Sequence, residues 1–281
     1  MLYSIDSPNG TFVLTVGRRQ AQWNGFELWL GFAPQTVGGE TRVHAVDAAR
    51  NLAPLLAETE PPAGTNRVLV IDPGHGGLNS GARSVLGNRL EKEFTLDWAF
   101  RLQRRLEDLG WQVSLTRTND VDLSLPERVG FAEECGAALF ISLHFNSGPN
   151  NGDAAGLETY CVTPRGLPST LVRGNPDDAD ATFPNNAFDS ENLRLAVRLH
   201  RELVRRTAEP DRGVRRARFM GVLGGQNRPA VLIEGGYLSN PREAGLIASP
   251  DYRQALAEAV AEALGPAPTQ PEDRAASGLT P

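Results

Sequence analysis

Two histidines and a glutamate each stand close after an apolar run, and their side chains suit metal chemistry. They are His75, His144 and Glu234, after runs that begin at Arg67, Ala138 and Pro229. Apolar runs of this length predict buried strands. In an open α/β sheet, side chains just past the carboxyl ends of the strands converge on one crevice. We therefore expect two imidazoles and a carboxylate to share one cleft.

Glu91 adds a second carboxylate at the start of the helix predicted after the His75 strand. Two histidines and one carboxylate form a familiar catalytic zinc environment, with the fourth position left for water. Glycines at 74, 76 and 77 let the backbone bend sharply around His75. A glycine-rich phosphate loop would instead need a helix directly after the glycines and a lysine at a set offset, and neither is present. One zinc per chain is the expectation.

Glu234 ends the most apolar of the runs and is followed by two glycines. A carboxylate in such surroundings is costly unless it has a partner or a chemical task. Beside a zinc-activated water it would act as general acid/base, taking the proton of the water and giving it to a leaving nitrogen. The rival interpretation makes Glu234 a fourth ligand without a catalytic role.

Five further polar residues have less specific interpretations. Asp72 either supports a metal ligand through a hydrogen bond or orders the turn before His75. Arg117 and Arg128 either recognise a substrate carboxylate or pair with nearby acids. His44 and His200 have no second candidate ligand beside them in the sequence, so we interpret both as surface histidines.

Composition sets limits on the class of protein. The 281 residues are 40% hydrophobic and 22% charged, and the net charge of −6 with no basic cluster argues against nucleic acid or an anionic membrane as the main partner. No run reaches the roughly 18 apolar residues of a membrane span, and the first residues lack the basic and apolar parts of a secretion signal. Cys135 and Cys161 form no Cys-x-x-Cys pair and are interpreted as small buried thiols.

The elements that must position these residues follow an α/β pattern. From residue 67 to 265, strand-like runs alternate with helical spacing, which predicts one mostly parallel or mixed sheet flanked by helices. Residues 1–60 show hairpin patterns around Asn24-Gly25 and predict a small β module. A linker is expected at 61–66 and a disordered tail at 266–281. The polar stretch 163–188 predicts a surface excursion.

Helix signals place the expected helices more closely. Apolar residues at helical spacing predict helices over 90–109, 189–207 and 251–264. Ser124 and Glu127 form a capping box that predicts a helix to about Glu134. Further strands are expected over 111–116 and 156–162.

Four motifs together resemble the zinc-dependent N-acetylmuramoyl-L-alanine amidases of the amidase 3 type. They are Asp72-Pro73-Gly74-His75-Gly76-Gly77, Glu91-Lys92, Ser142-Leu143-His144-Phe145-Asn146 and the stretch from Pro229 to Asn240. The resemblance covers about residues 67–264, in order. It implies a hydrolase that cuts the amide between N-acetylmuramic acid and L-alanine in peptidoglycan, outside the cell or in the periplasm.

Carried over by position, the resemblance implies His75, Glu91 and His144 as zinc ligands and Glu234 as the catalytic glutamate. Peptidoglycan or a muropeptide is then the substrate, and an activating partner protein remains open. Two alternatives stay open as well: a zinc peptidase of carboxypeptidase-like architecture, and a wall-binding module without catalysis. The closely spaced His-x-x-Glu pair of such peptidases is absent, and the four candidate site residues are intact.

Overall fold

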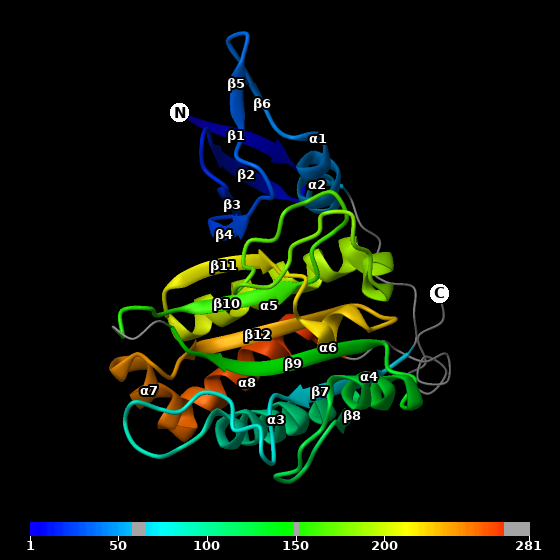
Figure 1. The fold of residues 1–281 in the computed structure, drawn as a ribbon, viewed down its shortest axis with the longest axis vertical. Helices are drawn as coiled ribbons and strands as arrows, with labels where there is room; N and C mark the ends of the chain where they lie inside the picture. The colour runs from blue at the N-terminus through cyan, green and yellow to red at the C-terminus, as the bar shows by residue number, and fades with distance from the viewer. Residues whose placement is uncertain (58–65, 149–151, 267–281) are drawn as a thin grey trace, which may run out of the picture.

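The computed structural model describes residues 1–57, 66–148 and 152–266, and it is built around one ten-stranded mixed sheet. The strand order is β1-β2-β3-β4-β11-β10-β12-β9-β7-β8. Figure 1 shows the strands stacked along the long axis, with the N-terminal strands at one end and β8 towards the other. The main strands are β7 (Val68–Pro73), β8 (Gln112–Leu115), β9 (Leu139–Asn146), β10 (Leu157–Cys161), β11 (Asp211–Arg216) and β12 (Ala230–Tyr237).

Strand direction decides which chain ends share an edge of the sheet. β7, β8, β9 and β12 run parallel, whereas β10 is antiparallel to β12 and parallel to β11. The carboxyl ends of β7, β9 and β12 therefore lie beside the amino ends of β10 and β11. The predicted mixed sheet flanked by helices is confirmed.

The helices form layers on the two faces of the sheet. One face carries α3 and α5, which contact the strands, and α8, which contacts both of these helices; the shorter helices α4 and α6 contact each other on the opposite side. The helices of this part are α3 (Glu91–Asp108), α4 (Leu125–Glu134), the 3₁₀ helix η2 (Pro184–Phe188), α5 (Asp189–Thr207), α6 (Gly221–Gly224), α7 (Pro241–Ala248) and α8 (Pro250–Leu264).

Local sequence explains why two of these helices begin where they do. In α3, Phe94, Trp98 and Leu102 are completely buried at a spacing of four residues, which is the apolar stripe of a helix facing a core. In α4, the Ser124 side chain accepts from the backbone N–H of Glu127, and the Glu127 carboxylate accepts from that of Ser124. The predicted capping box is confirmed.

The N-terminal part forms a β meander whose fourth strand joins the main sheet. Its elements are β1 (Leu2–Ser7), β2 (Gly10–Thr15), β3 (Gln20–Trp23), β4 (Phe26–Trp29), the hairpin β5 (Gln35–Val37) and β6 (Glu40–Arg42), and the helical run α1 (Ala45–Asp47), η1 (Ala48–Leu52) and α2 (Ala53–Leu56). Asn24 and Gly25 have φ angles of 51° and 85°, as a tight hairpin turn requires. The predicted hairpin is confirmed, but β4 pairs in parallel with β11, so the sheet is continuous.

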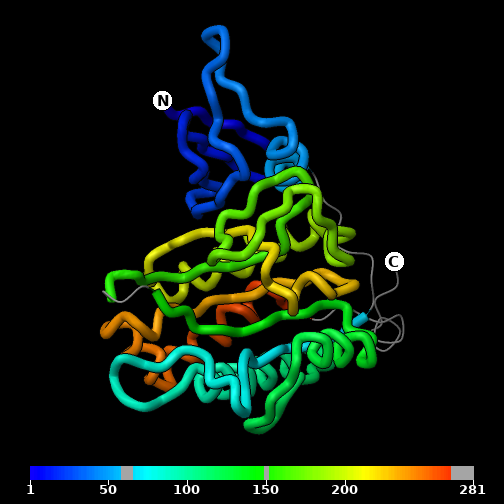
Figure 2. Tube along the Cα trace, in the orientation of Figure 1, coloured from blue at the N-terminus to red at the C-terminus, as the bar shows by residue number. Residues whose placement is uncertain are grey.

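The polar stretch after β10 is irregular, as its composition predicts, but it is firmly attached. Leu167 is completely buried, and Asp177 accepts from the Ser169 backbone and hydroxyl and pairs with Arg218. Figure 2 shows this segment beside residues 1–57, where Arg19 donates to the carbonyl of Ser169 at 3.2 Å. Residues 61–65 of the expected linker and 267–281 of the expected tail lie outside the described part of the chain.

Two expectations about single residues are wrong. His200 is completely buried, not on the surface, because its ring lies between Thr159 and Asp211 at 3.1 and 2.9 Å. Cys135 is only half-buried, whereas Cys161 is buried as expected.

Candidate active site

Three residues far apart in sequence meet at the carboxyl edge of β7 and β9. His75 follows β7, Glu91 begins α3 and His144 lies near the end of β9. One ligand atom from each lies within 4.8 Å of the others. Oε1 of Glu91 is 3.1 Å from Nε2 of His75 and 3.0 Å from Nδ1 of His144. The geometry brings together a possible His-Glu-His metal site.

The loop around His75 holds its ring in place at some cost to the backbone. His75 has a φ of 64°, in the left-handed region that few non-glycine residues adopt. Its Nδ1 lies 2.8 Å from Oδ1 of Asn79. A proton on Nδ1 suits that contact and leaves the lone pair of Nε2 towards Glu91. Two facing lone pairs repel each other, so a cation between Nε2 and the carboxylate would stabilise the arrangement.

Glycines leave the space in which these rings lie. A Cβ at Gly74 would stand 2.2 Å from Cε1 of His144. A Cβ at Gly81 would stand 2.5 Å from Oε2 of Glu91 and 2.6 Å from Cδ2 of His75. All three distances are shorter than any van der Waals contact, so larger residues would displace the candidate ligands.

Glu91 is a buried carboxylate with four polar neighbours, two backbone N–H groups and the two imidazoles. Its Oε1 accepts from the Phe145 backbone and its Oε2 from the Ala82 backbone, at 3.0 and 2.8 Å. Burial alone would raise the pKa of Glu91, but the hydrogen bonds with His144 and His75 outweigh it and hold the pKa below its ordinary value. Glu91 is therefore ionised at neutral pH, as a metal ligand must be.

Glu234 lies next to this cluster on β12. In the register of the sheet, Glu234 lies opposite His144 of the neighbouring strand β9 and opposite Glu158 of β10. Its side chain is 6% exposed, and Oε2 has no hydrogen-bond partner among the described residues. Burial raises its pKa to about 8, while His144 acts in the opposite direction. A buried carboxyl group with an unpartnered oxygen is a candidate for proton transfer.

Asp72, Arg117 and Arg128 build the strand ends instead of facing a ligand. Asp72 accepts from Arg128 at 2.6 Å, and also from Thr116 and Ser142. Arg117 donates to the backbone carbonyl of Pro73 at 2.9 Å. Both arginines are 3% exposed; the predicted pairing with a nearby acid is confirmed for Arg128, whereas Arg117 donates to backbone carbonyls. His44 is exposed and caps α1, away from any second candidate ligand of the described chain.

A polar network beside the cluster was not predicted from the sequence. Glu158 accepts from Asn146, Tyr160, Arg212 and Arg215. Asn146 lies in one of the motifs of the resemblance and Glu158 in a predicted strand, but a sequence gives no sign that their side chains meet. Their positions at strand ends near His144 were the available signal.

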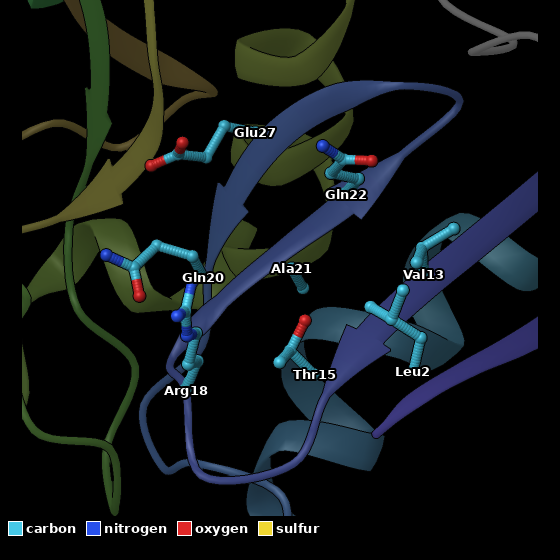
Figure 3. A pocket seen from close by; sticks show the side chains of 8 residues that line it. All are labelled: Leu2, Val13, Thr15, Arg18, Gln20, Ala21, Gln22 and Glu27. Atoms are coloured by element: carbon cyan, nitrogen blue, oxygen red, sulfur yellow. The ribbon is translucent and has the colours of Figure 1, made fainter.

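A groove of about 420 Å³ lies elsewhere, on the outer face of β1 to β4. Figure 3 shows its lining side chains, which are Leu2, Val13, Thr15, Arg18, Gln20, Ala21, Gln22 and Glu27. In the strand order β4 is four positions from β9, which corresponds to roughly 19 Å at the usual strand spacing. The groove holds no histidine and is separate from the His-Glu-His cluster.

Comparison with known proteins decides the family. Residues 69–265 match the family model described as N-acetylmuramoyl-L-alanine amidase. This chain belongs to the N-acetylmuramoyl-L-alanine amidase family. The predicted family and reaction are confirmed: the protein is an amidase that acts on the bond between N-acetylmuramic acid and L-alanine in peptidoglycan.

Relatives and solved structures agree with this placement. The amidase is 29% identical to N-acetylmuramoyl-L-alanine amidase AmiA of Escherichia coli (strain K12), over 84% of this chain and 89% of that protein. It is 32% identical to the structure of N-acetylmuramoyl-L-alanine amidase AmiC2 of Nostoc punctiforme, with a TM-score of 0.59 over 72% and 96% of the two chains. The catalytic domain of CwlV, the amidase from Bacillus (Paenibacillus) polymyxa var. colistinus, is 30% identical, with a TM-score of 0.57 over 70% and 96%.

Proposed function

We propose that the amidase is a zinc enzyme that binds one zinc ion per chain through His75, Glu91 and His144. Glu234 is the general acid/base. The observation that carries this proposal is the convergence of the three candidate ligands within 4.8 Å, next to a buried carboxyl group on the neighbouring strand. A fourth-ligand role for Glu234 is less well supported, because the group of candidate ligand atoms within 4.8 Å of one another contains His75, Glu91 and His144 and not Glu234.

The residues fit zinc in type and spacing. Zinc binds imidazole nitrogens at about 2.0–2.1 Å in tetrahedral sites, so its ligand atoms stand roughly 3.3 Å apart. The two nitrogen-to-oxygen distances at Glu91, 3.1 and 3.0 Å, are close to that separation. Glycine at positions 74 and 81 leaves the necessary room.

In the proposed hydrolysis, the zinc site activates the water and Glu234 transfers the proton. Zinc, when bound, would lower the pKa of a water molecule and polarise the amide carbonyl. Glu234 takes the proton of the attacking water and delivers it to the nitrogen of L-alanine, which leaves as the amine. The raised pKa of Glu234 suits both steps: it makes the carboxylate a stronger base towards the water proton, and the carboxyl group formed in this way can donate that proton near neutral pH. Its burial keeps bulk water away from the transferred proton.

The substrate suggests where the protein acts. Peptidoglycan lies outside the cytoplasmic membrane, so we place the amidase in the periplasm or outside the cell. Within the described chain, no helix is both long and apolar enough to cross a membrane. We also divide the chain into an N-terminal module at 1–60 and a catalytic domain at 67–265.

Metal analysis of single variants tests the zinc site. His75→Ala and His144→Ala should each lose most of the zinc, because the ligands come from separate segments and two cannot hold the ion as three do. The control is His44→Ala, an exposed histidine of the N-terminal part, which should keep one zinc per chain. Full zinc content in both site variants would remove them as ligands.

Product analysis tests the bond that is cut. Digestion of purified peptidoglycan should release stem peptides with an L-alanine N-terminus and leave the glycan intact. Mass spectrometry distinguishes these ends from cuts inside the peptide, which would favour a peptidase.

A further inference from the structure

Arg173 is a charged side chain beside the site that the proposed chemistry does not use. It lies in the irregular segment between β10 and η2 and is exposed. Its Nη2 donates to Oδ1 of Asn146 at 2.8 Å, and its guanidinium lies 5.8 Å from the centre of the Phe219 ring. Burial dominates the pKa of Glu234, but Arg173 is one of the cations that lower it, so its charge reaches the catalytic carboxyl group.

Asn146 links Arg173 to the residues of the site. Asn146 is two positions after His144 on β9, and side chains at that spacing face the same side of a sheet. Its Nδ2 donates to Oε2 of Glu158 at 2.9 Å, and Glu158 is the strand partner of Glu234. With its nitrogen bound to Glu158, the amide presents its oxygen to Arg173.

The charge of Arg173 is not needed to balance this network. Glu158 already accepts from Arg212 at 2.8 Å and Arg215 at 2.6 Å. The hydrogen bond of Arg173 goes to a neutral amide oxygen, and no carboxylate among the described residues forms an ion pair with its guanidinium. The cation is therefore available to an incoming anion.

The backbone holds this arginine in an uncommon conformation. Arg173 has a φ of 46° and is followed by Gly174 at 77°, both in the left-handed region. That conformation is unfavourable for a residue with a Cβ, and it persists only where surrounding contacts impose it. The bonds of Asp177 to Ser169 and Arg218 fix the following turn. The segment thus presents the guanidinium at one place.

We propose that Arg173 determines specificity by binding a free carboxylate of the stem peptide. The inference rests on the proposed function, because it assumes that the scissile amide lies beside Glu234 and that the stem peptide extends away from it. A guanidinium binds a carboxylate through two parallel charge-assisted hydrogen bonds. The contacts from Arg173 through Asn146 and Glu158 place it close to Glu234, so we assign it the first free carboxylate along the stem, the α-carboxylate of the second residue, D-glutamate.

Two soluble substrates test this assignment. They are disaccharide tetrapeptides that differ only in whether the second residue carries a free α-carboxylate or a carboxamide. The unaltered enzyme should prefer the carboxylate. Arg173→Gln should lower kcat/KM on the carboxylate substrate by about 10- to 100-fold, mainly through KM, the worth of one charge-assisted contact. On the carboxamide, kcat/KM should change by less than about twofold. Arg173→Lys keeps the charge but lacks the planar guanidinium that donates two parallel hydrogen bonds, and it should recover part of the loss in kcat/KM.

A neighbouring arginine is the matched control. Arg165 lies in the same segment but pairs with Asp180 at the surface, so Arg165→Gln should leave both substrates unaffected. Equal loss on both substrates in Arg173→Gln, or no loss on the carboxylate, would overturn the proposal. If the unaltered, zinc-loaded protein cuts neither substrate at the lactyl amide, the proposed function fails first and this inference with it. Cleavage without any preference for the carboxylate contradicts the inference alone.

Discussion

At the scale of single residues, the site contains two carboxyl groups whose pKa values are shifted in opposite directions. Glu91 is held as an anion by its donors, whereas burial raises the pKa of Glu234 to about 8. Both are almost completely buried, so the difference comes from their partners and not from exposure. A group that stays charged suits ligation, and a group that keeps its proton suits general acid catalysis.

Replacing Glu234 separates these roles. Glu234→Gln keeps the size of the side chain but cannot accept or donate the catalytic proton. Activity should fall by about 10²- to 10⁴-fold, the usual contribution of general acid/base catalysis, while zinc stays bound. Parallel metal analysis and turnover on a soluble muropeptide measure both effects. Loss of the zinc would instead make Glu234 a ligand, and near-normal turnover would remove it from the mechanism.

Glu158 connects the site to stability at low pH. Burial opposes its ionisation, but Arg215, Arg212 and Tyr160 lower its pKa below the ordinary 4.5. A depressed pKa in the folded state stabilises the protein above pH 4.5, and that stabilisation is lost as the pH falls through the lower, folded-state pKa.

Glu158→Gln should therefore lower the free energy of unfolding by about 3 kcal/mol at pH 7, because the arginines lose their buried partner. Below pH 4.5 the difference between the unaltered protein and the variant should shrink. Urea unfolding at pH 7 and pH 4 measures it. A difference that stays constant or grows on acidification contradicts the assigned direction.

The candidate ligands could be predicted from sequence because strand ends and residue types both constrain them. His75, Glu91 and His144 each stand at the end or start of a predicted element, and such ends share one sheet edge. His200 and Arg173 could not be placed, since their partners come from other elements. His200 lies on the core-facing side of α5, where Thr159 and Asp211 offset the cost of burying its ring.

At the scale of elements, the loop after β7 needs glycine at one point for a steric reason. A Cβ at Gly74 would collide with the His144 ring at 2.2 Å. Gly74→Ala should displace that imidazole and weaken zinc binding by about 10- to 100-fold, the effect of losing support for a ligand.

Titration with a zinc chelator measures the change in Gly74→Ala. The control is Gly130→Ala in α4, where a Cβ meets nothing within 4 Å. It should leave zinc affinity unchanged and stabilise the helix by up to about 1 kcal/mol. Unchanged zinc affinity in Gly74→Ala would show that the ring has room to move.

Helices with a clear apolar stripe were predicted almost to the residue, while strand β11 of the catalytic part was missed. α3, α4 and α5 match the expected ranges because capping and periodicity are local signals. β11 was not predicted, since Asp211–Arg216 contains a single large apolar residue, Val214. Its arginines are buried by pairing: Arg215 with Glu158, and Arg216 with Asn51 at 3.1 Å. Partners this far away in sequence leave no local pattern.

At the scale of the whole molecule, the N-terminal part extends the catalytic sheet. Its hairpin pattern was readable from the sequence, but its attachment was not, because β4 and β11 pair at only one register position, Leu28 with Val214. Side-chain contacts strengthen this junction. Asp211 accepts from the Glu27 backbone at 2.8 Å, and the Trp29 indole donates to the carbonyl of Arg212 at 3.1 Å.

Removing residues 1–63 tests what this junction contributes. All four proposed site residues lie beyond the removed part, so a chain that begins at Gly64 should bind zinc and hydrolyse a soluble muropeptide at close to the full rate. Its stability should fall, because β11 becomes an exposed edge and the 2% exposed Arg216 loses two of its acceptors, the Arg50 carbonyl and the Asn51 side chain, and keeps the Val162 carbonyl.

The size of that fall follows from the buried charge. Removing hydrogen-bond acceptors from a buried arginine costs about 1–3 kcal/mol, so the urea midpoint should decrease and the shortened chain should associate through its new edge. Asn51→Leu in the full chain removes one of these acceptors and should lower stability less, without association. Size-exclusion chromatography, urea unfolding and turnover per folded molecule measure the three effects. A shortened chain that folds and binds zinc but does not hydrolyse the soluble substrate would place part of the active site in residues 1–63 and contradict the proposed division of the chain.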